Sequence, residues 1–227
     1  YNPSPLALGD GMSGFSLGAP TAIGAAQPSV DAGSIAAFLT RILPAPAGRG
    51  RAIGIHYARR VRNTDGSTKK DVSMPGRAFY TIDEATKYAA GYLSLMQRSP
   101  DGITADLYTC MALCGMEVMQ SSNGNSRLMN TRQRAAMAAS KALFADLDVV
   151  DPADAKPKGY ATQQDALNHI DQLVTAGKIP SPTVRVSSGR GVHLHWVLDR
   201  ELNAAEWYTL GPVWSDYMTS LEIKHDK

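Results

Sequence analysis

Hydrophobic and polar residues become regularly spaced only after residue 30. Residues 1–30 are rich in Gly, Pro, Ser and Ala, with few large apolar residues at any period, which is typical of a loosely ordered arm. Helical and strand periods alternate along the rest of the chain. We therefore predict a low-complexity arm over 1–30 and a single domain over 31–227, with a smaller N-terminal lobe over about 31–130 and a second lobe over about 131–227.

The N-terminal half alternates between helical and strand patterns. Thr81 and Glu84 have the spacing of a capping box, which marks a helix start, and Asp65-Gly66 is typical of a hairpin turn. The predicted elements are helices over 29–43, 81–98 and 134–142, strands over 52–61 and 105–114, and a polar loop over 121–134.

The C-terminal half carries the clearest periods. An amphipathic helix is predicted over 162–177, ending at Gly177, and a last helix begins near Asn203 with Glu206 in the capping-box position. The segment 183–199 is typical of two strands around a Gly-rich turn, that is, a β-hairpin. Because strands and helices are mixed without a steady βαβ repeat, we expect an α+β fold.

Two carboxylates stand inside an otherwise apolar strand, in "FADLDVV" over residues 144–150. Asp146 and Asp148 are two apart, so both point to the same face of a sheet. Paired carboxylates on one face are best tolerated when a divalent cation neutralises them, and an all-oxygen donor set favours Mg²⁺ or Mn²⁺ over zinc. A strand end whose carboxylates accept from neighbouring backbone amides remains the structural alternative.

The predicted hairpin adds imidazoles and an anion-binding turn. Alternation places Val192, Leu194, Trp196 and Leu198 on one face of its second strand and His193 and His195 on the other. In the turn, Gly189 and Gly191 permit tight backbone geometry, which leaves amide groups, the Ser188 hydroxyl and Arg190 available to a phosphate group. Gly-rich hairpin turns also occur for purely geometric reasons.

Taken in order, these motifs resemble the archaeo-eukaryotic primase superfamily, and more narrowly the primase-polymerases encoded by phages and plasmids. The matching residues are Asp-x-Asp (Asp146 and Asp148) and the Ser-Gly-x-Gly-x-His block followed by a Trp (Ser188, Gly189, Arg190, Gly191, His193 and Trp196). The family also expects a third aspartate further on, for which Asp226 is the candidate. In this sequence His195 stands where an aromatic residue is frequent in the family.

The resemblance implies an RRM-like antiparallel or mixed sheet with a smaller N-terminal α/β lobe. It implies DNA primase or polymerase activity: metal-dependent nucleotidyl transfer from NTP or dNTP on a single-stranded DNA template. Asp146, Asp148 and Asp226 would hold two metal ions, and the hairpin turn with His193 would contact the triphosphate. We further expect a phage- or plasmid-encoded protein in the bacterial cytoplasm. The chain would be the catalytic core of a longer replication protein. A helicase module is a candidate for another part of that longer protein.

Basic residues are concentrated in one segment of the chain. The formal net charge is +2, but the segment from Arg49 to Arg77 holds eight Lys or Arg residues against two Asp. This segment is typical either of a surface along a phosphate backbone or of a solvated hairpin tip. The candidates to contact DNA are Arg59, Arg60 and Arg62 in this segment, and Arg132 and Arg134 in the polar loop. No apolar run is long enough to span a membrane, so we expect no membrane partner.

Two other functions compete with the polymerase. "HLHW" (193–196) also matches the His-hydrophobic-His strand of Rep and relaxase endonucleases of the HUH type, which cleave single-stranded DNA through a tyrosine; Tyr208 and Tyr217 would be the candidates. Neither is followed by Lys three residues later, as the Rep pattern requires. A non-catalytic single-strand-binding module would need aromatic residues exposed on the sheet.

Overall fold

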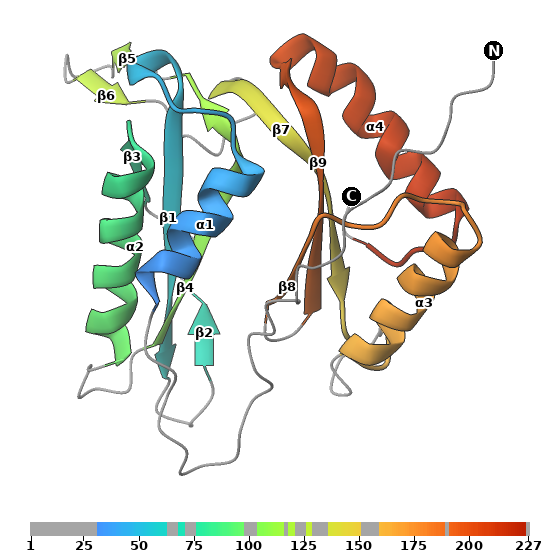
Figure 1. The fold of residues 1–227 in the computed structure, drawn as a ribbon. Coiled ribbons are helices and arrows are strands. Elements are labelled where there is room, and N and C mark those ends of the chain that lie inside the picture. The colour runs from blue at the N-terminus through green and yellow to red at the C-terminus, as the bar shows by residue number, and fades with distance from the viewer. Residues whose placement is uncertain are drawn as a thin grey trace.

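The α+β architecture predicted from the sequence is confirmed by the computed structural model (Figure 1). It describes residues 31–62, 68–70, 76–97, 104–115, 118–120, 126–128, 136–150, 159–188 and 191–225. The helices are α1 (Ala32–Ile42), α2 (Ile82–Gln97), α3 (Gln163–Thr175) and α4 (Ala204–Ser220), and a short 3₁₀ turn covers Gly48–Gly50. The strands are β1 (Ala52–Arg62), β2 (Thr68–Lys70), β3 (Gly76–Phe79), β4 (Thr104–Cys114), β5 (Val118–Gln120), β6 (Ser126–Leu128), β7 (Met137–Asp148), β8 (Val184–Ser187) and β9 (Gly191–Asn203).

One antiparallel sheet runs through the described part of the molecule, in the order β2-β1-β4-β7-β9-β8, with β3 also paired to β1. The sheet is narrow at its centre, because β4 and β7 pair only at Leu113 with Ala139 and at Cys114 with Met137. Beyond this joint the two strands diverge, so that β1, β3 and β4 form one half-sheet and β7, β8 and β9 the other (Figure 1).

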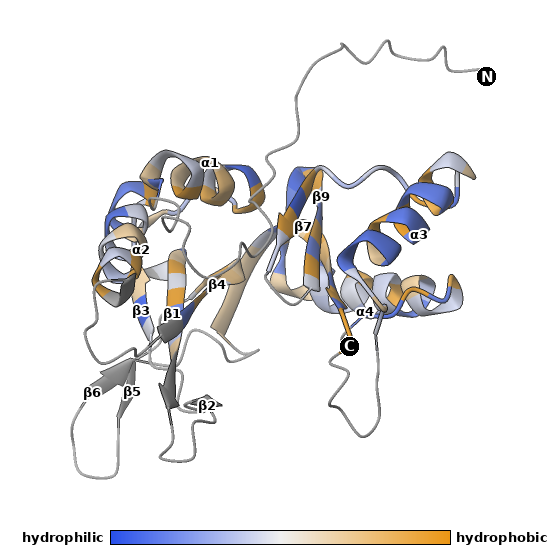
Figure 2. Ribbon diagram, turned by 90° about the horizontal axis from the view of Figure 1, so that it is seen from below, coloured by the Kyte–Doolittle hydropathy of each residue, from blue (hydrophilic) through white to orange (hydrophobic). Residues whose placement is uncertain are grey.

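Each half-sheet has a hydrophobic core of its own. Helices α1 and α2 contribute Leu39, Ile42 and Ala85 to a core with β1 and β4. Helices α3 and α4 contribute Ile170 and Met218 to a core with β7 and β9. The two helix pairs lie on opposite sides of the β7–β9 half-sheet (Figures 1 and 2). No helix in the described part of the chain is long and apolar enough to cross a bilayer.

Alternation along β7 and β9 sets which side chains enter the second core. Residues of both strands alternate between hydrophilic and hydrophobic in Figure 2. Leu143, Ala145 and Leu147 of β7 face the same core as Val192, Leu194 and Trp196 of β9. Side chains at the intervening positions of both strands therefore point to the other side of the sheet, away from α3 and α4.

Local signals in the sequence placed most helix ends correctly. The Asn203 side chain and Glu206 form the predicted capping box at the start of α4. The Glu84 amide donates to the Thr81 hydroxyl at 3.1 Å, as predicted for α2. Gly177 follows α3 with φ +65°, a left-handed conformation that costs a glycine little. The predicted Asp65-Gly66 turn lies outside the described residues, although β1 and β2 do pair as an antiparallel hairpin.

Two predicted elements are wrong. The alanine-rich segment 134–142 is predicted as a helix, whereas β7 begins at Met137 and includes most of it. Alanine favours helix, but pairing with β4 and β9 on either side outweighs that weak preference. The predicted loop over 121–134 contains the short strand β6, which pairs with β5; its other residues lie outside the described part.

At Gly191 the space between β9 and β7 cannot hold a Cβ atom, so its substitution should be costly. A Cβ there would lie 2.4 Å from the Leu147 carbonyl oxygen. We expect Gly191→Ala to lower the free energy of unfolding by about 1 to 3 kcal/mol, because the strands must separate. Gly91→Ala is the matched control: it lies in α2 with no heavy atom within 4 Å of the new Cβ, and should stabilise by about 0.5–1 kcal/mol. Urea unfolding of both variants checks this, and equal effects would contradict it.

Candidate active site

Asp146 and His193 meet directly across the pair of central strands. They are Cα partners in the β7–β9 register, and the Asp146 Oδ1 atom lies 3.2 Å from the His193 Nε2 atom. Both side chains are part-exposed, at 40% for Asp146 and 35% for His193. The two groups therefore share the face that points away from α3 and α4, where a solvent-borne ligand can reach them.

Asp148 continues the same row toward the hairpin turn. Two residues after Asp146, it is the register partner of Gly191 and is exposed. Consecutive carboxylates on one strand face are separated by about 7 Å along the strand, a span that a hydrated divalent ion can bridge. The Asp-x-Asp pair and the beginning of the hairpin's second strand thus lie side by side at one end of the half-sheet.

The hairpin turn itself is described at its two ends. The Ser188 amide donates to the Gly191 carbonyl oxygen at 3.0 Å, which closes the turn, and the Ser188 side chain is exposed. Gly189 and Arg190 lie outside the described residues. The neighbouring Ser187 hydroxyl donates to the Gln163 side chain of α3 at 3.1 Å, on the far side of the sheet from Asp146. Of the two serines, only Ser188 remains a candidate for phosphate contact.

His195 shares a face with His193 but has different surroundings. It is 1% exposed, and its ring makes an edge contact with Phe38 of α1 at 5.5 Å between centroids. Neither ring nitrogen has a hydrogen-bond partner in the described part of the chain. Burial, with a smaller contribution from nearby His193, lowers the pKa of the His195 imidazole to about 4. The covered, neutral His195 therefore does not present its nitrogens beside His193.

The donor chemistry at this end of β7 fits a hard divalent cation, since Asp146 and Asp148 offer carboxylate oxygens at an exposed surface. Among the described residues no three His, Cys, Asp or Glu side chains come together as a complete ligand set. The predicted third aspartate, Asp226, lies outside them. Lys224, two positions earlier, is anchored to Gly159, because its ammonium group donates to the Gly159 carbonyl at 2.9 Å.

Gly159 in turn touches the end of β7. A Cβ on Gly159 would lie 2.5 Å from the Asp148 carbonyl oxygen, and the next residue, Tyr160, donates its amide to that oxygen at 2.9 Å. The Tyr160 hydroxyl also accepts from the Lys224 amide at 3.3 Å. The segment that leads to Asp226 is therefore held beside the acidic end of β7 by Gly159 and Tyr160.

The arginines predicted to contact DNA are described only in part. Arg59, Arg60 and Arg62 belong to β1, where Arg60 is the register partner of Lys70 in β2. This end of β1 lies at the same end of the molecule as the Asp148 end of β7 (Figure 1). Arg132 and Arg134 lie outside the described residues.

Two features near Asp146 are not predicted from the sequence. Phe144, two residues before Asp146, is 40% exposed and stacks on Trp207 of α4 with ring centroids 6.2 Å apart. Strict alternation from Asp146 and Asp148 predicts that Lys141, an odd number of residues away, lies on the opposite face. Instead it lines a hollow together with Val197, which lies on the aspartate side. A register irregularity between Ser140 and Ala142 explains the difference.

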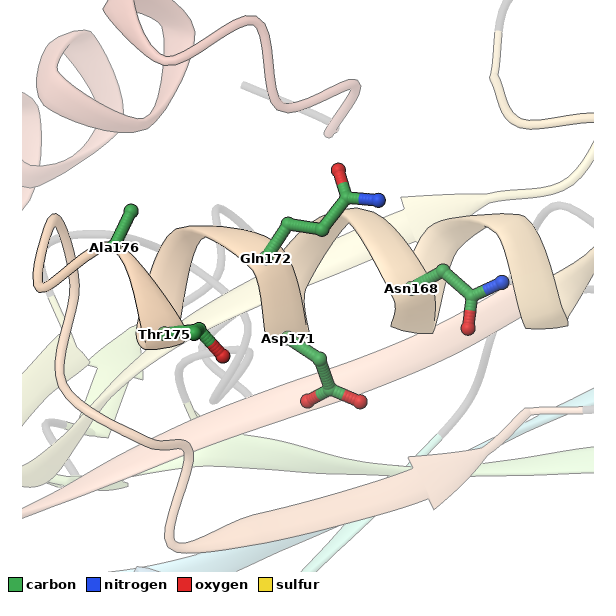
Figure 3. A pocket seen from close by; sticks show the side chains of 5 residues that line it. All are labelled: Asn168, Asp171, Gln172, Thr175 and Ala176. Atoms are coloured by element: carbon green, nitrogen blue, oxygen red, sulfur yellow. The ribbon is translucent and has the colours of Figure 1, made fainter.

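Another hollow on the described surface lies elsewhere, along α3 (Figure 3). Its volume is about 530 Å³, and it is lined by Asn168, Asp171, Gln172, Thr175 and Ala176. Asp171 is paired with Arg185 of β8 at 2.6 Å. Because α3 covers the opposite side of the sheet from Asp146, this hollow and the acidic row are separate surfaces.

No protein-family model, no curated protein and no solved structure matches this chain. The site must therefore be interpreted from its own residues and geometry.

Buried His195 makes stability depend on pH. Between its ordinary pKa of 6.5 and about 4, the unfolded chain binds a proton that the folded protein does not, so stability falls as the pH falls. We expect this group to remove about 2 kcal/mol between pH 7 and pH 5. His195→Phe keeps a ring against Phe38 and should lose less stability over this range, as measured by urea unfolding at each pH. Equal losses in both proteins would contradict the assignment.

Proposed function

We propose that this chain is a template-directed nucleotidyltransferase, a DNA primase or polymerase that joins nucleotides on single-stranded DNA with divalent metal ions. The observation that carries the proposal is the Asp146–His193 pair: a metal-type carboxylate and the imidazole of the glycine-rich hairpin face each other at 3.2 Å on an exposed surface. A single nucleotide triphosphate reaching both groups is the simplest ligand for that arrangement. The sequence resemblance to primase-polymerases, which includes the same two residues, suggests the same chemistry.

Each residue has a definite task in this reaction. Asp146 and Asp148, with Asp226 as the third candidate, hold Mg²⁺ or Mn²⁺. When bound, the ions neutralise charge at the attacking 3′-hydroxyl and at the departing pyrophosphate. His193 donates from Nε2, the atom that now faces Asp146, to a phosphate oxygen of the incoming NTP or dNTP. Ser188, Gly189, Arg190 and Gly191 surround the terminal phosphates with amide, hydroxyl and guanidinium donors.

Positioning supplies most of the rate in such a reaction, because the protein contributes no covalent nucleophile. The rigid pairing of β7 with β9 suits this task. Asp146 and His193 project from neighbouring strands that pair with each other rather than from loops, and the missing side chain of Gly191 lets those strands approach closely. The nucleotide would therefore be held between two groups whose separation the sheet determines.

The endonuclease alternative fits the geometry less well. It needs both imidazoles of the His-x-His strand at one metal, yet His195 is buried under Phe38. It also needs a tyrosine near them, yet the Tyr217 hydroxyl donates to the Lys178 backbone carbonyl. Tyr217 belongs to α4, which packs against Trp196 on the opposite side of the sheet through Trp214.

Primer extension tests the proposal. With a primed single-stranded template, labelled nucleotides and Mg²⁺ or Mn²⁺, we expect the protein to lengthen the primer. Asp146→Asn should lower the rate at least about 100-fold, because a metal ligand and its charge are lost while the side-chain shape is kept. Asp216→Asn, on exposed α4, is the matched control, and Tyr217→Phe should extend normally.

The opposite pattern would refute the polymerase. If the protein nicks the single strand without lengthening any primer, and Tyr217→Phe abolishes nicking while Asp146→Asn still nicks, the endonuclease is the better account. Binding of single-stranded DNA with neither product would favour the non-catalytic module.

A further inference from the structure

A second hollow opens between α1 and the central strands, on the same side of the sheet as Asp146. Its volume is about 350 Å³, and it is lined by Ala36, Ala37, Thr40, Arg41, Lys141 and Val197. Ala36 and Ala37 contribute only small side chains from α1, and Val197 contributes an apolar side chain from β9. The remaining lining groups are a guanidinium, an ammonium and a hydroxyl, all of which can donate to an anion.

The charge of this hollow is unbalanced. No Asp or Glu is among its lining residues. Within the described part of the chain, neither Arg41 nor Lys141 forms a hydrogen bond or an ion pair from its side chain. By contrast, Lys87 is paired with Asp83, Arg185 with Asp171 and Arg200 with Glu206. Two cations facing one small hollow repel each other, and an anion bound between them would relieve that repulsion.

Position separates this hollow from the triphosphate contacts proposed above. Val197 is four residues beyond His193 on the same face of β9, which corresponds to about 13 Å along the strand. Ser188 and Gly191 lie in the opposite direction from His193. Asp146 therefore lies between the hairpin turn and the hollow, as a catalytic centre lies between the incoming nucleotide and a nucleic-acid strand.

We propose that Arg41 and Lys141, with the Thr40 hydroxyl, bind a backbone phosphate of single-stranded DNA. This inference rests on the proposed function, which identifies the ligand of the hollow as a DNA strand rather than a free nucleotide. The hollow thus extends the reaction site by a strand-binding position that contacts no reacting atom.

Arg41 also has a structural role that the test must separate. It lies in the last turn of α1, where a cation is favourable for the helix dipole. Loss of that effect would lower stability without changing affinity for DNA. Charge-conserving exchange, Arg41→Lys with Lys141→Arg, keeps both contributions and serves as the rescue variant.

The test measures binding without catalysis. Fluorescence anisotropy of a labelled oligothymidylate of about 16 nucleotides is followed in EDTA, at salt concentrations between about 50 and 200 mM. We expect Arg41→Gln/Lys141→Gln to raise Kd about tenfold and to reduce the slope of log Kd against log salt by about 0.7, the value for one phosphate contact on a single strand. The control Lys87→Gln/Lys178→Gln removes the same charge from exposed positions elsewhere and should leave both quantities within twofold of the wild type.

The outcomes separate this proposal from the polymerase itself. Binding in EDTA requires neither metal nor catalysis, so a protein that never extends primers but loses affinity on substitution of Arg41 and Lys141 supports the strand site alone. Affinity and salt slope equal to those of the control pair would overturn the proposal. Weakened binding of a manganese–dNTP complex with unchanged oligonucleotide affinity would also overturn it, because the hollow would then hold a nucleotide. Failure of the charge-conserving variant to restore affinity counts against it as well.

Discussion

Pairing between β7 and β9 is the constraint on which the rest of this structure depends. The register is unbroken from Ala142 opposite Val197 to Asp148 opposite Gly191. A slip by one residue would turn both aspartates toward α3 and α4 and expose the aliphatic row, at a cost far larger than any gain in pairing. At the acidic end the missing side chain of Gly191 leaves room for the Leu147 carbonyl, which a Cβ would contact at 2.4 Å. The stability of the core and the geometry of the candidate site thus depend on the same register.

Helix α1 divides the polar face of this half-sheet into regions with different properties. Where Phe38 covers it, His195 is dry and neutral; one pleat further on, His193 is part-exposed and contacts Asp146. Two identical side chains on one strand therefore differ in solvation and in access to ligands. A His-x-His sequence consequently does not by itself define a metal site, since burial of one imidazole removes it from the donor set.

Local patterns predicted much of the fold and part of the site. Alternation in β9 put His193 and His195 on one face, and the capping residues at Thr81 and Asn203 marked their helices, because these signals lie within a few residues of one another. The burial of His195 was not predictable, since Phe38 is far away in the sequence. Nor was the position of Lys141, because it lies at an irregularity in the β7–β9 pairing. Alanine-rich β7 shows the same limit, as its partners rather than its composition made it a strand.

The narrow joint between the half-sheets has a mechanical consequence. Two residue pairs connect β4 to β7 near Ala139, and the ion pair of Arg51 with Glu201 lies at the same end. Asp148 is nine residues along β7 from that joint, about 30 Å away, so a rotation of about 10° there displaces the carboxylate by about 5 Å. Asp146 and Asp148 therefore lie at the end of β7 that moves most when the half-sheets rotate about the joint. The distance between Asp148 and the β1–β4 half-sheet therefore depends strongly on side-chain packing at the joint.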